Sequence, residues 1–431
     1  MSRSVRTVLL STAAAIFALG ASADASMEER VAALEEMVAT LKAELAAEKA
    51  KTDESIVRIE KSVAEAPAAA PAPQKTDGFL VGDTTLKFGG FIDADIHVTS
   101  LTDGGIASTS IARDFYIPGA IPIGGDGTTF TDFTAEPSRF FLAASKPVGD
   151  GKVEGYIEMD FLGSGQGNEL VSNSYSPRLR RAFVKYGNWL VGQEWSTFQN
   201  TSAIPESASF LALPDGMIFI RQPQVRYTNG NWMFALENPN TTTLNAGSRD
   251  ENIIPDVVAR YNLSGEFGNV SVSGIARQLR ADFGPTEEES FGYGLSVSGK
   301  VNMGAKDDVR FNLVGGEGIG RYVGLAASRS VAVDPNGALD AIPSVGGFVA
   351  WRHPFGETAR FSGGYSGLFV DNPGYLPMTT TKSVQSVFGA ILWDVAPKVT
   401  LGVELMQGTR EDESGNKGDM TRFTFSTKYA F

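Results

Sequence analysis

The most regular pattern in this chain is an alternation of apolar and polar residues, and it is clearest over its last eleven residues. That segment reads T-R-F-T-F-S-T-K-Y-A-F, so Phe423, Phe425, Tyr429 and Phe431 share one face of a strand and polar residues fill the other. A transmembrane β-barrel needs such strands, because one face meets lipid and the other faces water. The pattern therefore predicts a membrane-spanning strand, with an edge strand of a soluble sandwich as the alternative.

The same alternation recurs from residue 78 onward in segments of about ten residues, the usual length of a membrane-spanning strand. Short turns separate some of these segments, at Val148–Gly151, Gly187-Asn188, Asn229-Gly230, Gly265–Gly268, Gly304–Asp307, Pro354–Glu357 and Val395–Pro397. Longer gaps separate the others, near residues 100–136, 163–177, 197–217, 238–253, 280–289, 316–344, 371–381 and 408–420. Eight long and seven short connections predict an all-β transmembrane barrel of sixteen antiparallel strands.

The period changes to that of a helix between Met27 and Val63. Apolar residues there follow the 3-4 spacing of heptads and restart after a four-residue stutter, at Val31, Leu34, Val38, Leu41, Leu45, Ile56, Ile59 and Val63. This spacing predicts an N-terminal α-helical coiled coil over residues 24–63, of two or three strands, with a solitary spacer helix as the alternative. Three prolines then predict an extended Ala/Pro-rich linker over residues 64–77.

The first 23 residues have the features of a secretory signal peptide. Arg3 and Arg6 precede an apolar core, and Ala21-Ser22-Ala23 is a small-residue cleavage site. The expected organisation is therefore a signal peptide (1–23), a periplasmic coiled-coil helix (24–63), a linker (64–77) and an outer-membrane barrel domain (78–431).

Composition narrows the classes of function. The chain has no cysteine, which excludes disulfides, thiolate metal sites and cysteine nucleophiles. Its formal charge of −13 makes nucleic acid an unfavourable partner. Neither His97 nor His353 lies in a nucleophile motif, and the glycine clusters at 163–167 and 315–320 lack the spacing of a dinucleotide-binding loop. We therefore expect no enzyme activity and no cofactor.

A sixteen-strand barrel is wide enough to enclose a water-filled channel, so function is expected on its inward face. The alternation turns carboxylates inward at Asp93, Asp95, Glu154, Glu158 and Asp160. It also turns inward Arg310, Arg352, Arg360 and Arg422, and the six residues expected to line the pore and bind solute: Arg139, Arg181, Lys185, Arg226, Arg260 and Arg277. Guanidinium groups bind carboxylates well in a confined lumen. The alternative is that they pair with acidic residues on neighbouring strands and stiffen the wall.

Two further segments raise specific questions. The gap at 197–217 is unusually apolar for a loop, with Ile204 and Phe210 among its residues, so it is expected either to fold into the lumen and narrow it or to contact another subunit. Asp93, Asp95 and His97 share one strand face and could ligate a divalent cation. Because inward polar residues follow from the alternation itself, we expect no metal site there.

Five stretches follow one another along the barrel region: G-D-T-T-L-K-F-G-G-F-I-D-A-D at 82–95, E-P-S-R-F-F-L at 136–142, L-V-G-Q-E-W-S-T-F at 190–198, P-Q-V-R-Y at 223–227 and the terminal Phe431. In this order they resemble the DcaP-like trimeric porins of Gram-negative outer membranes. The resemblance implies a homotrimer in the cell outer membrane, with its N-terminal helices as a periplasmic stalk. It also implies uptake of small organic acids, dicarboxylates among them, through pore arginines. Arg139 and Arg226 lie inside the matching stretches.

Such a porin would meet outer-membrane lipid, lipopolysaccharide and small anionic solutes, and its coiled coil makes peptidoglycan a further candidate partner. Two other functions stay open. A sugar porin requires a row of inward aromatic side chains on which sugars can stack. The inward aromatic residues of this chain are few and scattered: Phe91, Phe141, Tyr156, Phe183 and Phe348. An envelope tether would use the helix as a spacer, although no recognisable wall-binding module precedes it.

Overall fold

The computed structural model describes residues 78–163, 172–245, 252–282, 287–304 and 306–431, together with scattered positions between Ala32 and Glu54. The chain divides into two compact units, Met1–Lys75 and Thr76–Phe431. The described positions of the first unit are helical. The signal peptide, the apolar heptad positions and the linker lie outside the described residues. Among the described residues, no helix combines the length and apolar character that crossing a bilayer requires.

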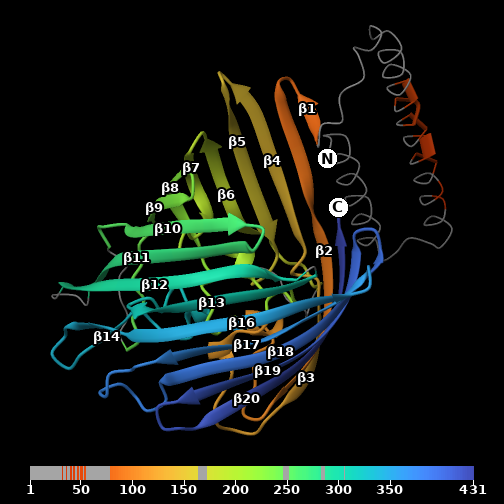
Figure 1. Cartoon of the computed structure of the whole chain (residues 1–431). Helices are drawn as coiled ribbons and strands as arrows, with labels where there is room; N and C mark the ends of the chain where they lie inside the picture. The colour runs from red at the N-terminus through yellow and green to blue at the C-terminus, as the bar shows by residue number, and fades with distance from the viewer. Residues whose placement is uncertain are drawn as a thin grey trace. The chain divides into compact units, whose positions relative to one another are not determined.

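The second unit is a closed antiparallel barrel of sixteen strand positions, as the alternation predicts (Figure 1). Strand β20 (Lys417–Ala430) pairs with β2 (Thr84–Leu101), with Phe425 opposite Ile96, and this pairing closes the ring. The strands between them follow in chain order: β4 (Arg139–Val148), β5 (Gly151–Asp160), β6 (Arg178–Tyr186), β7 (Trp189–Trp195), β8 (Arg221–Asn229), β9 (Trp232–Glu237), β10 (Asp256–Gly265), β11 (Gly268–Asp282), β12 (Glu287–Met303), β13 (Asp307–Glu317), β16 (Pro343–Phe355), β17 (Ala359–Val370), β18 (Thr381–Ala396) and β19 (Val399–Asp412).

Two short strands modify the ring at β2. The first, β1 (Phe79–Val81), forms a hairpin with the start of β2. The second, β3 (Thr129–Thr134), pairs with β2 from Asp95 to Ser100, whereas β4 pairs with β2 from Thr85 to Phe91. Strands β3 and β4 thus occupy the same position in the ring, and they pair with successive parts of β2. The prediction of one continuous loop over residues 100–136 is therefore wrong at Thr129–Thr134, which form a strand.

The predictions of long loops at 280–289 and 408–420 are also wrong, because most of these residues belong to paired strands. Strands β11 and β12 stay paired until Asp282 opposes Glu287, and β19 and β20 until Glu411 opposes Lys417. At these ends both strand faces carry polar residues, because both lie beyond the apolar band and meet water. The hydrophobic alternation therefore stops before the backbone pairing does.

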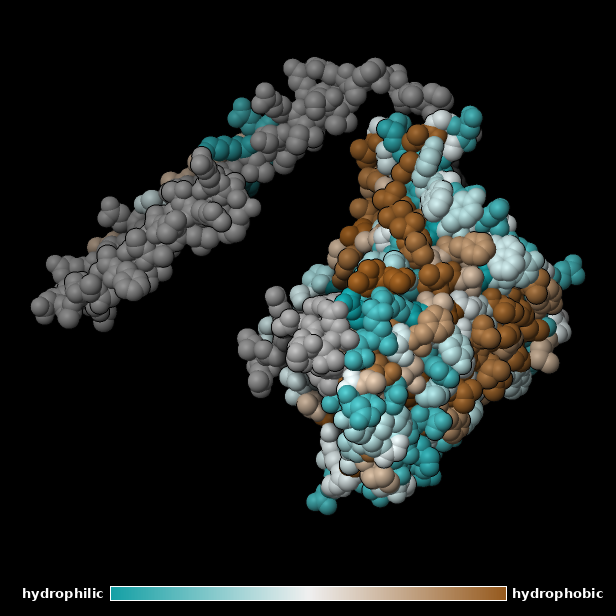
Figure 2. All heavy atoms as spheres, turned by 90° about the vertical axis from the view of Figure 1, so that its left-hand side faces the viewer, coloured by the Kyte–Doolittle hydropathy of each residue, from teal (hydrophilic) through white to brown (hydrophobic). Residues whose placement is uncertain are grey.

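The outer face of the barrel carries its exposed apolar side chains, as lipid contact requires. Along β2, Phe88 and Ile92 are each 56 % exposed, whereas Asp93 and Asp95, which follow on the opposite face, are buried. Figure 2 shows apolar side chains gathered side by side on one such face. Aromatic pairs lie near the short turns, with ring centroids 4.8 Å apart for Trp189 and Tyr227. Such aromatics are typical of a membrane interface.

Candidate functional site: the arginines of the barrel lumen

The apolar segment between β7 and β8 folds into the lumen. The Ser209 hydroxyl donates to Glu404 on β19 at 2.6 Å, and the Gly216 N–H donates to Ser366 on β17 at 2.8 Å. Both acceptors are buried on strands across the barrel from β7. The sequence predicts that residues 197–217 either fold into the lumen or contact another subunit. In the structure they fold into the lumen.

Two other loops meet this segment in the lumen. One is residues 102–128, with the 3₁₀ turns η1 (Ile111–Arg113) and η2 (Pro118–Ala120); the other is residues 318–342, with η4 (Gly324–Ala326), β14 (Val331–Val333) and β15 (Leu339–Ala341). We call these two loops and residues 196–220, which include η3 (Thr201–Ala203), the inner loops. Apolar side chains of residues 102–128 and 196–220 pack into one buried cluster, in which Phe115 and Phe210 have ring centroids 4.9 Å apart. Those of residues 318–342 lie mainly in two neighbouring buried clusters.

A buried carboxyl group fastens two of the inner loops to the wall. Asp215 accepts hydrogen bonds from the Tyr116 hydroxyl, at 2.7 Å, and from the hydroxyl of Ser386 on β18. Burial raises the pKa of Asp215 to about 6, because the charged form loses its water there. Burial and the neighbouring Asp215 carboxyl together raise the pKa of Tyr116 well above its usual value.

Arginines and carboxylates gather where β4, β5 and β6 meet. Arg178 makes two hydrogen bonds to Asp160, both of 2.9 Å, and Arg180 donates to Glu158 at 2.8 Å and to Asp160 at 2.6 Å. Such charge-assisted, two-pronged pairs are strong and fix the guanidinium planes. Arg178 and Arg180 therefore pair with carboxylates of a neighbouring strand and stiffen the barrel wall, which is the alternative to solute binding.

The sequence alternation does not identify Arg180 as an inward-facing residue. The pairing of β5 with β6 shifts by one, so that Glu158 opposes Arg181 and Met159 opposes Leu179. Arg180 is the extra residue of this β-bulge, and bulges turn neighbouring side chains toward the same face. Its side chain is 1 % exposed and reaches the same carboxylates as its neighbours. A sequence pattern of period two cannot place a residue after an inserted one.

Three arginines near this group lack a hydrogen-bonded carboxylate within the described residues. Arg139 comes no closer than 3.9 Å to Glu158, and its Nε atom has no partner. Arg221 lies over the Trp195 ring at 4.8 Å, with one terminal nitrogen unpaired, and the Nε of Arg226 is also unpaired. All three are partly exposed. Their guanidinium groups therefore keep hydrogen-bonding capacity that the described residues do not use.

The remaining expected residues divide between the lumen and the interior. Arg260 donates to the backbone oxygen of Gln199 in an inner loop and leaves its Nε without a partner among the described groups. Lys185 lies 3.7 Å from Glu154 and is half-exposed toward the short-turn end. Arg181 donates both prongs to Glu194, at 2.7 and 2.5 Å.

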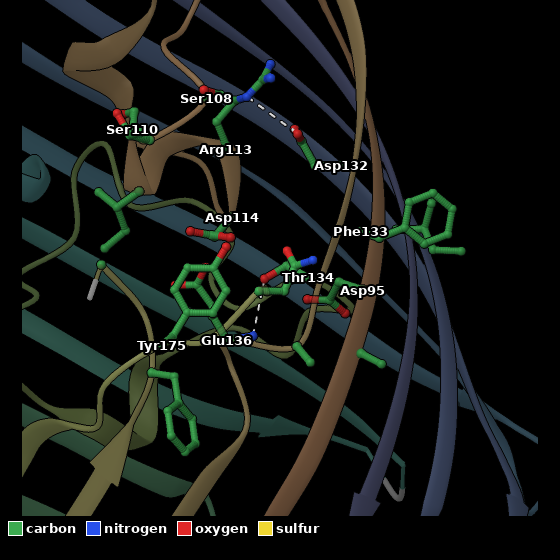
Figure 3. Close-up of a pocket in the computed structure, with 18 of the residues that line it drawn as sticks. Asp95, Ser108, Ser110, Arg113, Asp114, Asp132, Phe133, Thr134, Glu136 and Tyr175 are labelled. Atoms are coloured by element: carbon green, nitrogen blue, oxygen red, sulfur yellow. Dashed lines mark hydrogen bonds and ion pairs between the residues drawn. The ribbon is translucent and has the colours of Figure 1, made fainter. Parts of the chain in front are cut away.

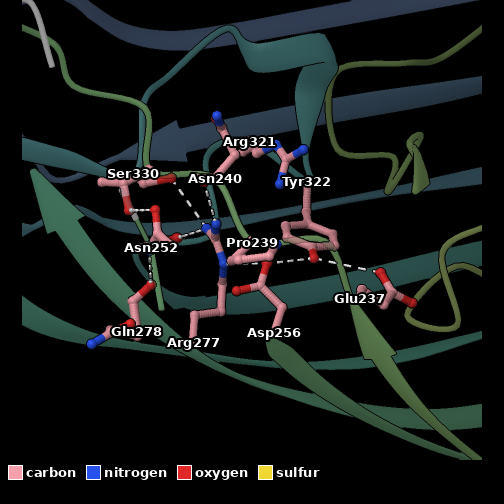
Figure 4. A network of polar contacts seen from close by, with 12 residues as sticks. Glu237, Pro239, Asn240, Asn252, Asp256, Arg277, Gln278, Arg321, Tyr322 and Ser330 are labelled. Atoms are coloured by element: carbon pink, nitrogen blue, oxygen red, sulfur yellow. Dashed lines mark hydrogen bonds and ion pairs between the residues drawn. The ribbon is translucent and has the colours of Figure 1, made fainter. Parts of the chain in front are cut away.

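Arg277 lies in a closed network instead (Figure 4). Its guanidinium donates to Asp256 at 3.0 Å, to the backbone oxygen of Asn240 at 2.7 Å and to Ser330 at 3.1 Å. The Tyr322 hydroxyl donates to the same Asp256 at 2.7 Å. Arg277 is 1 % exposed, so protein surrounds it on all sides. In this structure it joins β11 to the inner loop 318–342 and has no open side for a solute.

Four other inward arginines also fasten inner loops. Arg352 and Arg360 share Glu206, at 2.8 and 2.7 Å, and Arg310 donates to the backbone oxygen of Ile204 at 2.6 Å. The fourth, Arg422, donates to the backbone oxygen of Ala112 at 2.7 Å. The inner loops are thus held by charge-assisted bonds to strands around the wall.

Three inward aromatics are neighbours, which corrects the expectation that they are scattered. Tyr156 stacks between Phe141 and Phe183, with ring centroids 5.4 Å apart on either side. The Arg181 guanidinium lies over the Tyr156 ring at 4.5 Å. The register of β4, β5 and β6 creates this row, and positions in one strand alone do not show it.

The described residues contain no group of three or more histidine, cysteine or carboxylate side chains that could hold a metal ion. His97 uses its Nδ1 to contact Thr424 at 3.0 Å, and Asp93 pairs with Lys428 at 3.0 Å. Asp93, Asp95 and His97 do face the lumen side together, but they do not converge on one point.

Comparisons with known proteins agree with this architecture. The model of the family described as DcaP outer membrane protein matches residues 69–431. The chain is similar to the outer membrane channel DcaP of Acinetobacter baumannii, with a TM-score of 0.71 and 23 % identity over 82 % of this chain and 99 % of that one. It is also similar to an anion-selective porin from Comamonas acidovorans, with a TM-score of 0.51 and 11 % identity over 81 % and 100 %. At such identities the likeness shows the fold. No curated protein matches the sequence.

Proposed function

Because the chain belongs to the DcaP outer membrane protein family, we propose that it is a porin that prefers small organic anions, such as dicarboxylates, and passes them along an arginine-lined side of its lumen. The observation that carries this proposal is a set of partly exposed guanidinium groups, on Arg139, Arg221 and Arg226, to which the described residues offer no hydrogen-bonded carboxylate. A solute carboxylate supplies the acceptors that they lack.

The local charge balance supports an anion rather than a cation. Arg139, Arg178, Arg180 and Arg221 are close enough for their charges to repel one another. Together with Arg181 they set five positive charges against the three negative charges of Glu158, Asp160 and Glu194. The surplus attracts anions even where individual pairs are satisfied.

The inner loops strengthen this attraction where they approach the arginines. The ring of Phe210 lies 5.9 Å from the Arg139 guanidinium and 5.7 Å from that of Arg180. An apolar side chain opposite a charge lowers the local dielectric constant, which increases the interaction of that charge with a solute. In the proposed function, residues 196–220 therefore narrow the passage at the arginines.

The proposal includes the assembly that the sequence resemblance implies, a homotrimer surrounded by outer-membrane lipid and lipopolysaccharide, with the N-terminal helix in the periplasm. Each barrel would conduct through its own lumen, since β2 and β20 close the ring within one chain.

The test is conductance of the purified protein in a planar bilayer. We expect the reversal potential across a salt gradient to show anion preference, and succinate on one side to block the current. Arg139→Gln and Arg226→Gln should each weaken the block about tenfold, since a hydrogen bond to a charged group contributes about 1.5–3 kcal/mol. Lys146→Gln is the matched control, because this half-exposed lysine at the strand end pairs with Asp83 near the short turns.

A preference for cations, without block by succinate, would contradict the anionic pathway. The assignment as a porin would still hold. The row of Phe141, Tyr156 and Phe183 favours one alternative solute, because sugars stack on aromatic faces. Block by maltotriose in place of succinate would identify a sugar porin.

A further inference from the structure

The barrel wall has a break beside β3. One edge of this strand pairs with β2, and no strand among the described residues pairs with the other. The strand that would continue the wall there, β5, ends at Asp160, and the next residue turns away to donate its N–H to the Glu136 backbone oxygen at 3.1 Å. A recess of about 1290 Å³ occupies the break, between the wall and the inner loop 102–128 (Figure 3).

The recess is acidic, in contrast to the arginine side of the lumen. Its carboxylates come from four segments, at Asp95, Asp114, Asp132 and Glu136. Arg113 is the one basic residue among its described lining, and it already lies 3.4 Å from Asp132. Arg422, behind this lining, is also close enough to Asp132 and Asp114 for their charges to interact. The four carboxylates still outnumber the two arginines, so the balance of charge favours a cation.

Asp95 is the residue that indicates a ligand. It is 2 % exposed and lines the recess, and neither carboxylate oxygen accepts a hydrogen bond of good geometry from the described residues. The neighbouring Ser426 hydroxyl donates to Asp93 instead, at 3.2 Å. Lys428 is bonded to Asp93 instead, at 3.0 Å, and the His97 Nε2 lies 3.9 Å away, beyond hydrogen-bond distance. A buried carboxylate without partners is costly, so a bound donor would remove a substantial penalty.

We propose that this recess binds an organic ammonium group, with Asp95 as its principal acceptor. The described residues offer no three-ligand cluster for a metal ion, whereas an ammonium group needs hydrogen-bond acceptors and tolerates aromatic faces. Both are present, since Phe133, Phe161, Tyr175 and Phe425 line the recess beside the carboxylates. The site is separate from the arginine pathway and does not depend on the preference for anions.

Two sources could supply the ammonium group. The lining includes inward residues such as Asp95 and outward ones such as Phe133, which is 72 % exposed. The recess therefore lies between the lumen and the lipid, and either a dissolved amine or the headgroup of phosphatidylethanolamine could enter it.

The experiment measures binding of ethanolamine to the purified full-length protein in detergent by titration calorimetry. A second arm compares melting temperatures in nanodiscs that contain phosphatidylethanolamine or phosphatidylglycerol. We expect Asp95→Asn to weaken ethanolamine binding at least tenfold, or to abolish the stabilisation by phosphatidylethanolamine. Glu154→Gln removes a similar lumen-side charge outside the recess and should leave both responses unchanged.

A response to ethanolamine in detergent alone assigns the site to dissolved amines, and a response to phosphatidylethanolamine alone assigns it to lipid. Absence of both responses in the wild type, or equal responses in Asp95→Asn, would overturn the proposal. Should Asp95→Asn fail to fold, Asp114→Asn tests the same recess from an inner loop rather than from a strand, with the same expected loss.

Discussion

Single arginines in this lumen differ in how much of their bonding capacity the protein already uses. Arg277 is fully enclosed and bonded to Asp256, whereas Arg226 is partly exposed and leaves its Nε free of any described partner. The two residues have the same charge and the same inward parity. Their roles should therefore separate in experiments that measure stability and conductance independently.

Replacing Arg277 with alanine should destabilise the barrel by about 3–5 kcal/mol, because it leaves the buried Asp256 carboxylate without its cation. Urea unfolding followed by tryptophan fluorescence in detergent measures this change. Lys185→Ala is the control, since its half-exposed pair with Glu154 should contribute less than about 1 kcal/mol. If Arg277→Ala unfolds at the wild-type urea concentration, the buried pair is not structural. Recovery of stability in the double variant Arg277→Ala with Asp256→Asn would confirm that the unpaired charge is the cause.

At this scale the sequence could predict which face a side chain occupies, but not its partner. The alternation correctly turns Arg139 and Arg226 inward, because lipid on one side forces a strict period of two. It misplaces Arg180, because one inserted residue in β6 reverses the parity locally. It also cannot separate Arg277 from Arg226, since enclosure depends on an inner loop that is distant in sequence.

At the scale of elements, the inner loops are held to the wall by a few polar contacts, one of which titrates. Burial raises the pKa of Asp215 to about 6, so the folded loop binds this proton more tightly than an unfolded chain does. The protonated form favours the packed state, and that contribution is lost as the pH rises from about 4 to about 6. Above that range the effect should be constant.

We therefore expect current fluctuations from loop opening to become more frequent as the pH rises from 4 to 6.5. Asp215→Asn cannot titrate and should remove this dependence while keeping an acceptor for Tyr116 and Ser386. Single-channel recordings at fixed voltage test this, with Asp334→Asn, at an exposed turn, as the control. Fluctuations that grow as the pH falls would contradict the assignment, as would an unchanged pH dependence in Asp215→Asn.

Element boundaries could be predicted where hydrophobic contrast marks them and not elsewhere. The short turn at Gly187-Asn188 is found correctly, because apolar strands end abruptly on both sides of it. The turn predicted at Asn229-Gly230 lies one residue later, at Gly230-Asn231. The pairing of Glu411 with Lys417 is missed, because that end of the hairpin has water on both faces and no contrast remains. Strand β3 is missed for a related reason, since it lies after a long glycine-rich loop and covers only half of a barrel position.

At the scale of the whole molecule, the chain joins a self-contained barrel to a separate N-terminal unit. The seam between β2 and β20 is completed by the last residue, since the Phe431 N–H donates to the Gly90 oxygen at 3.0 Å and its ring stacks on Phe88 at 5.6 Å. Among the described residues, every contact needed to close the ring therefore lies between residues 78 and 431. The N-terminal unit is then free to serve another purpose, such as the envelope tether that the sequence leaves open.

Deleting residues 24–77 while keeping residues 1–23 should therefore leave folding and conductance unchanged. The expected result is a heat-modifiable band in electrophoresis and a single-channel conductance within about 20 % of the wild type, because the lumen keeps its strands and inner loops. Deleting Phe431 is the opposite control, since it removes the seam contacts and should impair barrel assembly. If the shortened protein conducts but cells lose envelope integrity, the N-terminal unit is a tether attached to a porin. If it neither folds nor conducts, the barrel depends on that unit, and the independence inferred from the β2–β20 seam is wrong.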